Sequence, residues 1–116
     1  MGIFEFDEQE NGYIAEINYV KFFCRTIKDG YVEKAERLAD AYPDQIYQIV
    51  EYIADEVRST FGYMSRDEIA EGLGVPTVNL DTDMISYLEQ TLDDCHIIDV
   101  EFGGLFDEFY SMSIDG

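Results

Sequence analysis

The side chains that could do chemistry in this sequence are one histidine, two cysteines and many carboxylates. A zinc site needs several ligands at close spacing, but His96 has only Cys95 beside it and Cys24 is far away along the chain. A catalytic nucleophile needs a base and an orienting group, and no Gly-x-Ser-x-Gly or comparable motif accompanies the single histidine. We therefore predict a non-enzymatic protein with no catalytic residue, no metal site, no cofactor and two buried free thiols.

Two acidic clusters, at residues 81–83 and 93–94, suggest calcium at first sight. An EF-hand loop that starts at Asp81 would need glycine at its sixth position and glutamate at its twelfth. The sequence has Ser86 and Leu92 there, so the pattern fails. The glycines at 72, 74, 103 and 104 match no nucleotide-binding pattern either.

Charge is the strongest feature of the composition. The chain has 26 acidic and seven basic residues, for a formal net charge of −19 at pH 7. All seven basic residues precede Asp67, so the last 50 residues carry carboxylates alone. Such a field repels nucleic acid and anionic membranes and attracts basic proteins. The start of the chain resembles neither a signal peptide nor a myristoylation signal, and we expect a cytoplasmic protein that neither binds nucleic acid directly nor enters a membrane.

Hydrophobic periodicity predicts one α+β domain, residues 1–116, with an antiparallel sheet of about five strands and helices packed on one face. The element order is β-β-α-α-α-β-β-β. The expected strands are residues 2–7, 12–25, 82–94, 95–102 and 106–114, and the expected helices are 31–42, 43–60 and one that opens at Ser65. The segment 82–94 also fits a helical stripe, and we favour a strand because the strands after it need partners.

Local signals mark a boundary of each of the three helices. Pro43 is expected to end the first helix and to open the second, whose residues Ile49, Ile53 and Val57 should pack on the sheet through Ile98 and Val100. The motif Ser65-x-x-Glu68 is a capping box that should start the third helix.

The last two strands should form a hairpin around Gly103-Gly104. A three-residue loop, 103–105, would pair Phe102 with Phe106 and Ile98 with Tyr110, which keeps the apolar side chains of both strands on one face. A glycine would supply the positive φ that such a loop needs.

This register gives the hairpin an acidic outer face. It would place Glu101 opposite Asp107 and Asp99 opposite Phe109. Like charges directly across a strand pair are unfavourable, and a basic partner would relieve them. We therefore predict that Asp99, Glu101, Asp107 and Phe109 bind a basic protein partner, with Phe109 as an aromatic anchor.

Residues 65–78 resemble the core of helix-turn-helix regulators, in which a second helix carries basic or amide side chains to DNA. The segment that follows here, Asn79 to Asp83, is acidic and has no lysine or arginine. Phosphate contacts supply most of the affinity of such modules, so we do not expect this segment to bind DNA.

The second half of the chain resembles small uncharacterised bacterial α+β domains that end on Ser-Ile-Asp-Gly, here Ser113 to Gly116, with further likeness at residues 76–78 and 86–89. In size, acidity and element order the chain is similar to bacterial immunity proteins, which neutralise basic nuclease toxins. The resemblance implies an inhibitor or immunity protein that docks a basic partner. Two alternatives stay open: a DNA mimic acting on a DNA-binding protein, and a small enzyme or metabolite-binding domain.

Overall fold

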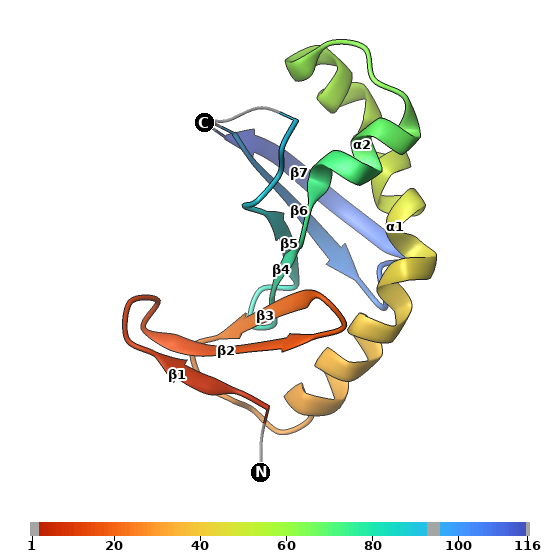
Figure 1. Cartoon of the computed structure of the whole chain (residues 1–116). Helices are drawn as coiled ribbons and strands as arrows, with labels where there is room; N and C mark the ends of the chain where they lie inside the picture. The colour runs from red at the N-terminus through yellow and green to blue at the C-terminus, as the bar shows by residue number, and fades with distance from the viewer. Residues whose placement is uncertain (1–2, 93–95, 116) are drawn as a thin grey trace.

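The computed structural model describes residues 3–92 and 96–115 as one sheet with two helices on one of its faces (Figure 1). The strands follow chain order across the sheet, from β1 at one edge to β7 at the other. They are β1 (Glu5–Asp7), β2 (Gly12–Ile17), β3 (Val20–Cys24), β4 (Thr77–Asn79), β5 (Met84–Tyr87), β6 (Ile97–Gly103) and β7 (Glu108–Asp115). The α+β class is confirmed, with helices on one face.

The sheet is mixed, not antiparallel, and it has seven strands where five were predicted. The parallel pair is β3 with β4, and the connection between them contains both helices. One additional strand comes from residues 12–25, which form the hairpin β2–β3 in place of one long strand, and the other is β4, where no strand was predicted. Asn18 and Tyr19 make the turn of the β2–β3 hairpin with φ of 50° and 66°. Segment 82–94 contains a strand, as favoured, which among its described residues, 82–92, covers Met84–Tyr87; residues 93 and 94 lie outside the described part of the chain.

The predicted break at Pro43 is wrong, because α1 (Tyr31–Phe61) runs continuously through it. Proline costs a helix interior about 3 kcal/mol. The apolar residues on both sides of it face the same sheet, and their burial offsets that cost: Leu38 and Ala39 before it and Ile49 and Ile53 after it are all fully buried. The expected third helix is α2 (Arg66–Leu73), and its capping box at Ser65 is confirmed.

The core lies between the helices and the sheet. Ile49, Ile53 and Val57 of α1 belong to one buried cluster with Ile98 and Val100 of β6, as predicted. In the part of the chain that the structure describes, neither helix has an apolar stretch long enough to cross a bilayer.

Candidate functional site

The final hairpin has a different register from the predicted one. Phe102 pairs with Phe109, and Gly103 pairs with Glu108, so the loop has four residues, 104–107. A bulge follows, because Glu101 pairs with Ser111 and leaves Tyr110 as the extra residue. The predicted positive φ on a loop glycine is confirmed at Gly104, where φ is 61°.

The physical reason for the shift is the burial of Phe106 within the loop. Its φ is 65°, and its ring packs 4.6 Å from that of Phe102 and 5.8 Å from that of Tyr42, between ring centroids. The bulge then turns Phe109 toward the core, while Tyr110 lies over Gly103. A methyl group on Gly103 would lie 2.3 Å from the Tyr110 hydroxyl, so the exposed Tyr110 ring would have to move to make room for it.

The four residues predicted to bind a partner are therefore not on one surface. Glu101 is not opposite Asp107, and Asp99 is not opposite Phe109. Asp107 is a loop residue whose carboxylate accepts a 3.0 Å hydrogen bond from the Leu105 backbone N–H. Phe109 stacks on Tyr52 of α1, with ring centroids 5.1 Å apart, and so lies on the helix side of the sheet.

Asp99 and Glu101 do share a surface, the sheet face away from the helices. On β7 each of them faces a serine, where Asp107 was predicted opposite Glu101 and Phe109 opposite Asp99. Asp99 pairs with Ser86 and Ser113, and the Ser86 hydroxyl donates a hydrogen bond to it. Glu101 pairs with Ser111, whose hydroxyl donates to its carboxylate at 3.0 Å.

This open face can be followed strand by strand through the register. One row of paired residues crosses from β2 to β7 and is polar throughout: Glu16, Lys21, Thr77, Ser86, Asp99 and Ser113. The next row starts at β1 and is mixed: Glu5, Ile14, Phe23, Asn79, Met84, Glu101 and Ser111. Charged, polar and apolar side chains thus share this face.

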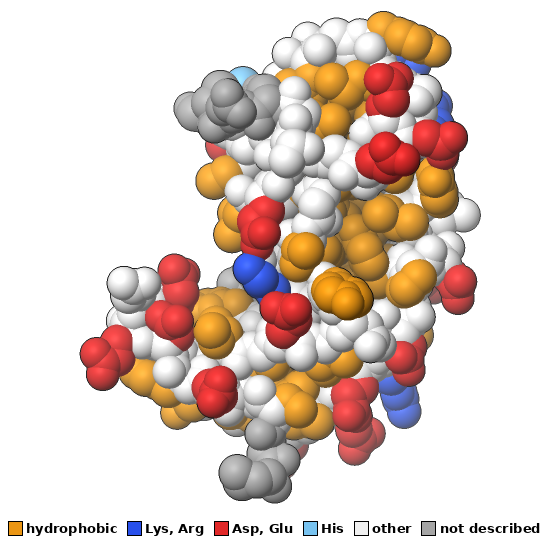
Figure 2. All heavy atoms as spheres, viewed as in Figure 1, with side chains coloured by type: hydrophobic (Ala, Val, Ile, Leu, Met, Phe, Trp, Pro, Cys, Tyr) orange, Lys and Arg blue, Asp and Glu red, His pale blue; other side chains and the backbone are white. Residues whose placement is uncertain are grey.

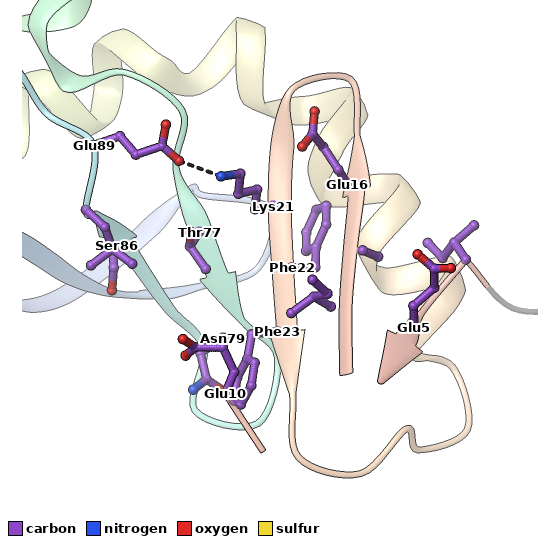
Figure 3. Close-up of a pocket in the computed structure, with 14 residues that line it drawn as sticks. Glu5, Glu10, Glu16, Lys21, Phe22, Phe23, Thr77, Asn79, Ser86 and Glu89 are labelled. Atoms are coloured by element: carbon purple, nitrogen blue, oxygen red, sulfur yellow. Dashed lines mark hydrogen bonds and ion pairs between the residues drawn. The ribbon is translucent and has the colours of Figure 1, made fainter. Parts of the chain in front are cut away.

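A groove of about 740 Å³ lies on the β1–β5 part of this face, and Figure 2 shows the molecule hollowed there with acidic side chains at the margin. Its apolar lining includes Ile14 and Phe23, and Leu88 stands at one side, 55% exposed. The carboxylates that line it are those of Glu5, Glu10, Glu16 and Glu89 (Figure 3).

Among the described residues that line the groove, Lys21 is the one cation. Its ammonium group lies 2.6 Å from a Glu89 carboxylate oxygen (Figure 3). The hydrogen bond to Glu89 raises the pKa of Lys21, burial opposes the shift, and the charges of Glu89 and of Glu16 add to the increase. Four carboxylates against one ammonium group leave the groove with a net negative charge.

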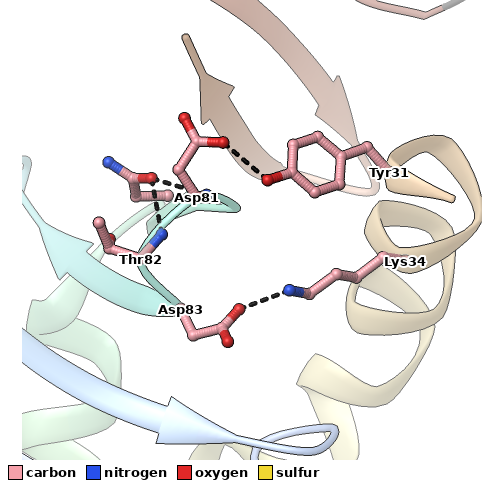
Figure 4. A network of polar contacts seen from close by, with 6 residues as sticks. Tyr31, Lys34, Asp81, Thr82 and Asp83 are labelled. Carbon is pink, nitrogen blue, oxygen red and sulfur yellow. Dashed lines mark hydrogen bonds and ion pairs between the residues drawn. The ribbon is translucent and has the colours of Figure 1, made fainter. Parts of the chain in front are cut away.

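The β4–β5 turn carries a second polar cluster, at the start of α1 (Figure 4). The Asp81 carboxylate accepts hydrogen bonds from the Arg25 backbone N–H and the Tyr31 hydroxyl, both at 2.7 Å, and Lys34 pairs with Asp83. Burial tends to raise the pKa of Asp81, but these two hydrogen bonds and nearby cations hold it below its usual value. Burial and the hydrogen bond to Asp81 raise the pKa of Tyr31 to about 12. The cluster thus connects the β4–β5 turn with the end of β3 and with the first turn of α1.

The thiol of Cys24 and the imidazole of His96 lie in packed surroundings away from the groove. Cys24 is a free, buried thiol, and its pKa is raised by burial and then by the charge of Asp81, which disfavours the reactive thiolate. Cys95 lies outside the described residues. The His96 ring packs edge-on against Phe61, with centroids 5.5 Å apart. Across residues 3–92 and 96–115 we find no group of three or more metal-ligating side chains that could hold an ion.

Sequence reasoning missed the groove because its walls come from distant parts of the chain. Residues of β3 meet those of β4 through a parallel pairing, Lys21 with Thr77 and Phe23 with Asn79. The available signal was the run 12–25, where apolar side chains occupy both faces. No protein-family model, curated protein or solved structure matches this chain.

Proposed function

We propose that the chain is a non-enzymatic acidic binding protein that docks a basic segment of a protein partner on the open face of its sheet. A toxin-immunity or inhibitor protein would act in this way. The observation that carries the proposal is the groove, which combines an apolar lining, four carboxylates and a single cation that is already paired.

The apolar lining supports a protein partner. Ile14 is 39% exposed in the groove and Phe23 is partly exposed beside it, so both can contact an incoming side chain. Apolar contact at the centre with charge around it is the arrangement of many protein interfaces. The surrounding carboxylates would steer a basic partner and select against acidic ones.

Asp99 and Glu101 extend the same negative surface beyond the groove. Asp99 of β6 pairs with Ser86 of β5, which lines the groove. Glu101 of β6 pairs with Met84, which is also on β5. These two predicted binding residues keep that role in the proposal. Asp107 and Phe109 do not, because one holds the loop and the other packs against Tyr52.

The DNA-mimic alternative calls for a different surface. Carboxylates that imitate phosphates must protrude, as Glu36, Asp40 and Asp44 do on the exposed face of α1. A hollow with an apolar lining does not imitate a phosphate backbone. The acidic face of α1 therefore serves as the control surface for the experiment.

The first step of the test is photo-crosslinking in cells of the source organism. Leu88→p-benzoylphenylalanine places the crosslinker in the groove, and Tyr63→p-benzoylphenylalanine places it at an 81% exposed position in the α1–α2 connection. We expect a crosslink to a basic protein from position 88 and not from position 63. An acidic or neutral partner, or no crosslink at 88, would overturn the proposal.

The second step measures affinity with the purified partner. The groove variant Glu5→Gln/Glu10→Gln/Glu16→Gln and the helix variant Glu36→Gln/Asp40→Asn/Asp44→Asn remove equal charge from exposed positions. We expect the groove variant to weaken binding about tenfold or more and the helix variant about twofold or less. The reverse order would favour the DNA mimic, and equal losses would mean that only net charge matters.

A further inference from the structure

The edge strand β7 has unused hydrogen-bonding capacity. It is eight residues long and pairs only with β6 among the residues that the structure describes. The other edge, β1, has three residues. Natural sheets blunt long edges with lysine, proline or bulges. β7 has neither lysine nor proline, and its one bulge is at Tyr110, which leaves Ser111–Asp115 as a regular edge.

The side chains along this edge differ between the two faces. On the open face, Ser111 and Ser113 are small, and Glu101 and Asp99 lie directly behind them on β6. A lysine or arginine on an added strand could reach past a serine to these carboxylates. On the helix side, Met112 and Ile114 are partly buried at the margin of the core, where an added apolar side chain would cover them.

A second copy of this chain does not suit the edge. Each copy has a net charge of −19, and pairing two β7 strands would bring Asp99, Glu101 and Asp115 of both copies close together. Such repulsion costs association energy and slows encounter. The charge that discourages self-pairing favours a cationic strand.

We propose that β7 binds an extended segment of a basic partner by β-strand addition, with cationic side chains on the open face alternating with apolar side chains on the helix side. Main-chain hydrogen bonds would supply affinity, and alternation would supply specificity, because successive residues of a strand point to opposite faces. This edge is at the opposite end of the sheet from β1 and the groove, and it does not depend on ligand binding in the groove.

The probe is a short peptide in which lysine and valine alternate, titrated against ¹⁵N-labelled protein at low salt, where surface charge is least screened. The control peptide has the same composition, with its lysines in one block and its valines in another. We expect amide shifts and slowed hydrogen exchange along Ser111–Asp115 with the alternating peptide, and binding about tenfold weaker with the block peptide.

Two matched double variants locate the site. Ser111→Lys/Ser113→Lys places cations on the edge, and Ser59→Lys/Thr60→Lys adds the same charge to exposed positions at the end of α1. We expect about tenfold weaker peptide binding for the edge variant and about twofold or less for the control. The groove variant should bind this peptide at β7 normally, which separates the two proposals.

Three results would overturn strand addition. The first is peptide binding without amide protection in β7, and the second is equal binding by the two lysine variants. The third is a dimer of the unmodified protein, detected by light scattering and lost in the edge variant, which would assign the edge to a second copy. Thermal unfolding of each variant confirms that it is folded before it is scored.

Discussion

Neighbouring residues of each strand point to opposite faces of the sheet, and the side chains on the two faces differ in polarity. One row on the helix side is apolar throughout: Ala15, Phe22, Val78, Ile85, Val100 and Met112. The neighbouring row on the open side is polar throughout and starts at Glu16. Residues of the first row are mostly buried, and those of the second are exposed or partly exposed. The comparison shows that the helix side of the sheet supplies the buried packing, and the open side is the one on which we propose that a partner binds.

The largest test of this division compares two isoleucines. Ile53 of α1 is fully buried against the sheet, and Ile14 of β2 is 39% exposed on the open face. We expect Ile53→Ala to lower the free energy of unfolding by about 2–5 kcal/mol, because it leaves a cavity. Ile14→Ala should cost about 1 kcal/mol or less. Urea unfolding measures both.

Equal costs for the two isoleucine variants would mean that the open face is covered in solution, for instance by another copy of the chain. A cost below about 1 kcal/mol for Ile53→Ala would mean that α1 is not docked on the sheet as described.

A smaller effect should come from the polar pair inside the core. The Tyr42 and Tyr87 hydroxyls lie 2.8 Å apart, both residues are buried, and burial raises the pKa of Tyr42 to about 12. Tyr87→Phe leaves the Tyr42 hydroxyl without this partner, at an expected cost of about 1–3 kcal/mol. The double variant Tyr42→Phe/Tyr87→Phe should recover part of that loss, since no buried hydroxyl then lacks its partner.

Thermal and urea unfolding of both single variants and the double variant form a double-mutant cycle. Additive losses would show that the two hydroxyls do not depend on each other, contrary to the geometry.

Much of the fold was predictable where the signals were local. The apolar stripe of Ile49, Ile53 and Val57 and the capping box at Ser65 each lie within a few turns of helix. The alternation of Ile98, Val100 and Phe102 set the inner face of β6 correctly. Such patterns depend only on the periodicity of the backbone.

The errors came from interactions that the local pattern does not encode. The turn at Asn18-Tyr19 was missed because tyrosine is typical of strands, although asparagine adopts positive φ readily. Pro43 stays inside a helix because both flanking segments bury against the same sheet. The parallel pairing of β3 with β4 joins distant segments, and without it the groove does not exist.

The hairpin error moved the predicted site. Strict alternation along the last strand placed Tyr110 on the core side. In the structure Phe106 is buried within the loop, and the bulge at Tyr110 places Phe109 on the core side instead. Asp99 and Glu101 were assigned to an exposed face correctly, because they precede the bulge. Phe109 was assigned to the wrong face, because it follows the loop.

The β4–β5 turn gives a test that depends on pH. The pKa of Asp81 is lowered in the folded state, so its carboxylate stabilises the fold at neutral pH, and this contribution disappears as the pH falls through the folded-state pKa. Asp81→Asn should therefore lower the free energy of unfolding at pH 7. We expect a loss of only about 1 kcal/mol, because the side chain is largely exposed and solvent screens its charge. The difference in stability between this variant and the unmodified protein should become smaller below about pH 4, where the Asp81 carboxylate is protonated.

Thermal unfolding between about pH 3 and pH 7 measures this effect. The control is Asp40→Asn on the exposed face of α1, for which we expect little change at either pH. A constant deficit for Asp81→Asn at every pH would mean that the lost contribution is not that of the charged carboxylate.

The smallest expected effect is that of salt, and it tests whether repulsion is concentrated on the open face. Raising the salt concentration to about 0.5 M screens charges beyond a few Å, so the melting temperature should rise by a few degrees. The groove variant should melt higher than the unmodified protein at low salt and gain less from added salt, because Glu5, Glu10 and Glu16 share their groove with only one cation. The helix variant should show a smaller change, because Arg37 already lies among its carboxylates.

A melting temperature that falls with salt would mean that the ion pairs, such as Lys21 with Glu89, outweigh the repulsion. If the melting temperatures of the two variants change equally with salt, the repulsion is spread over the whole molecule. The open face would then not be the part of the surface where negative charge is concentrated.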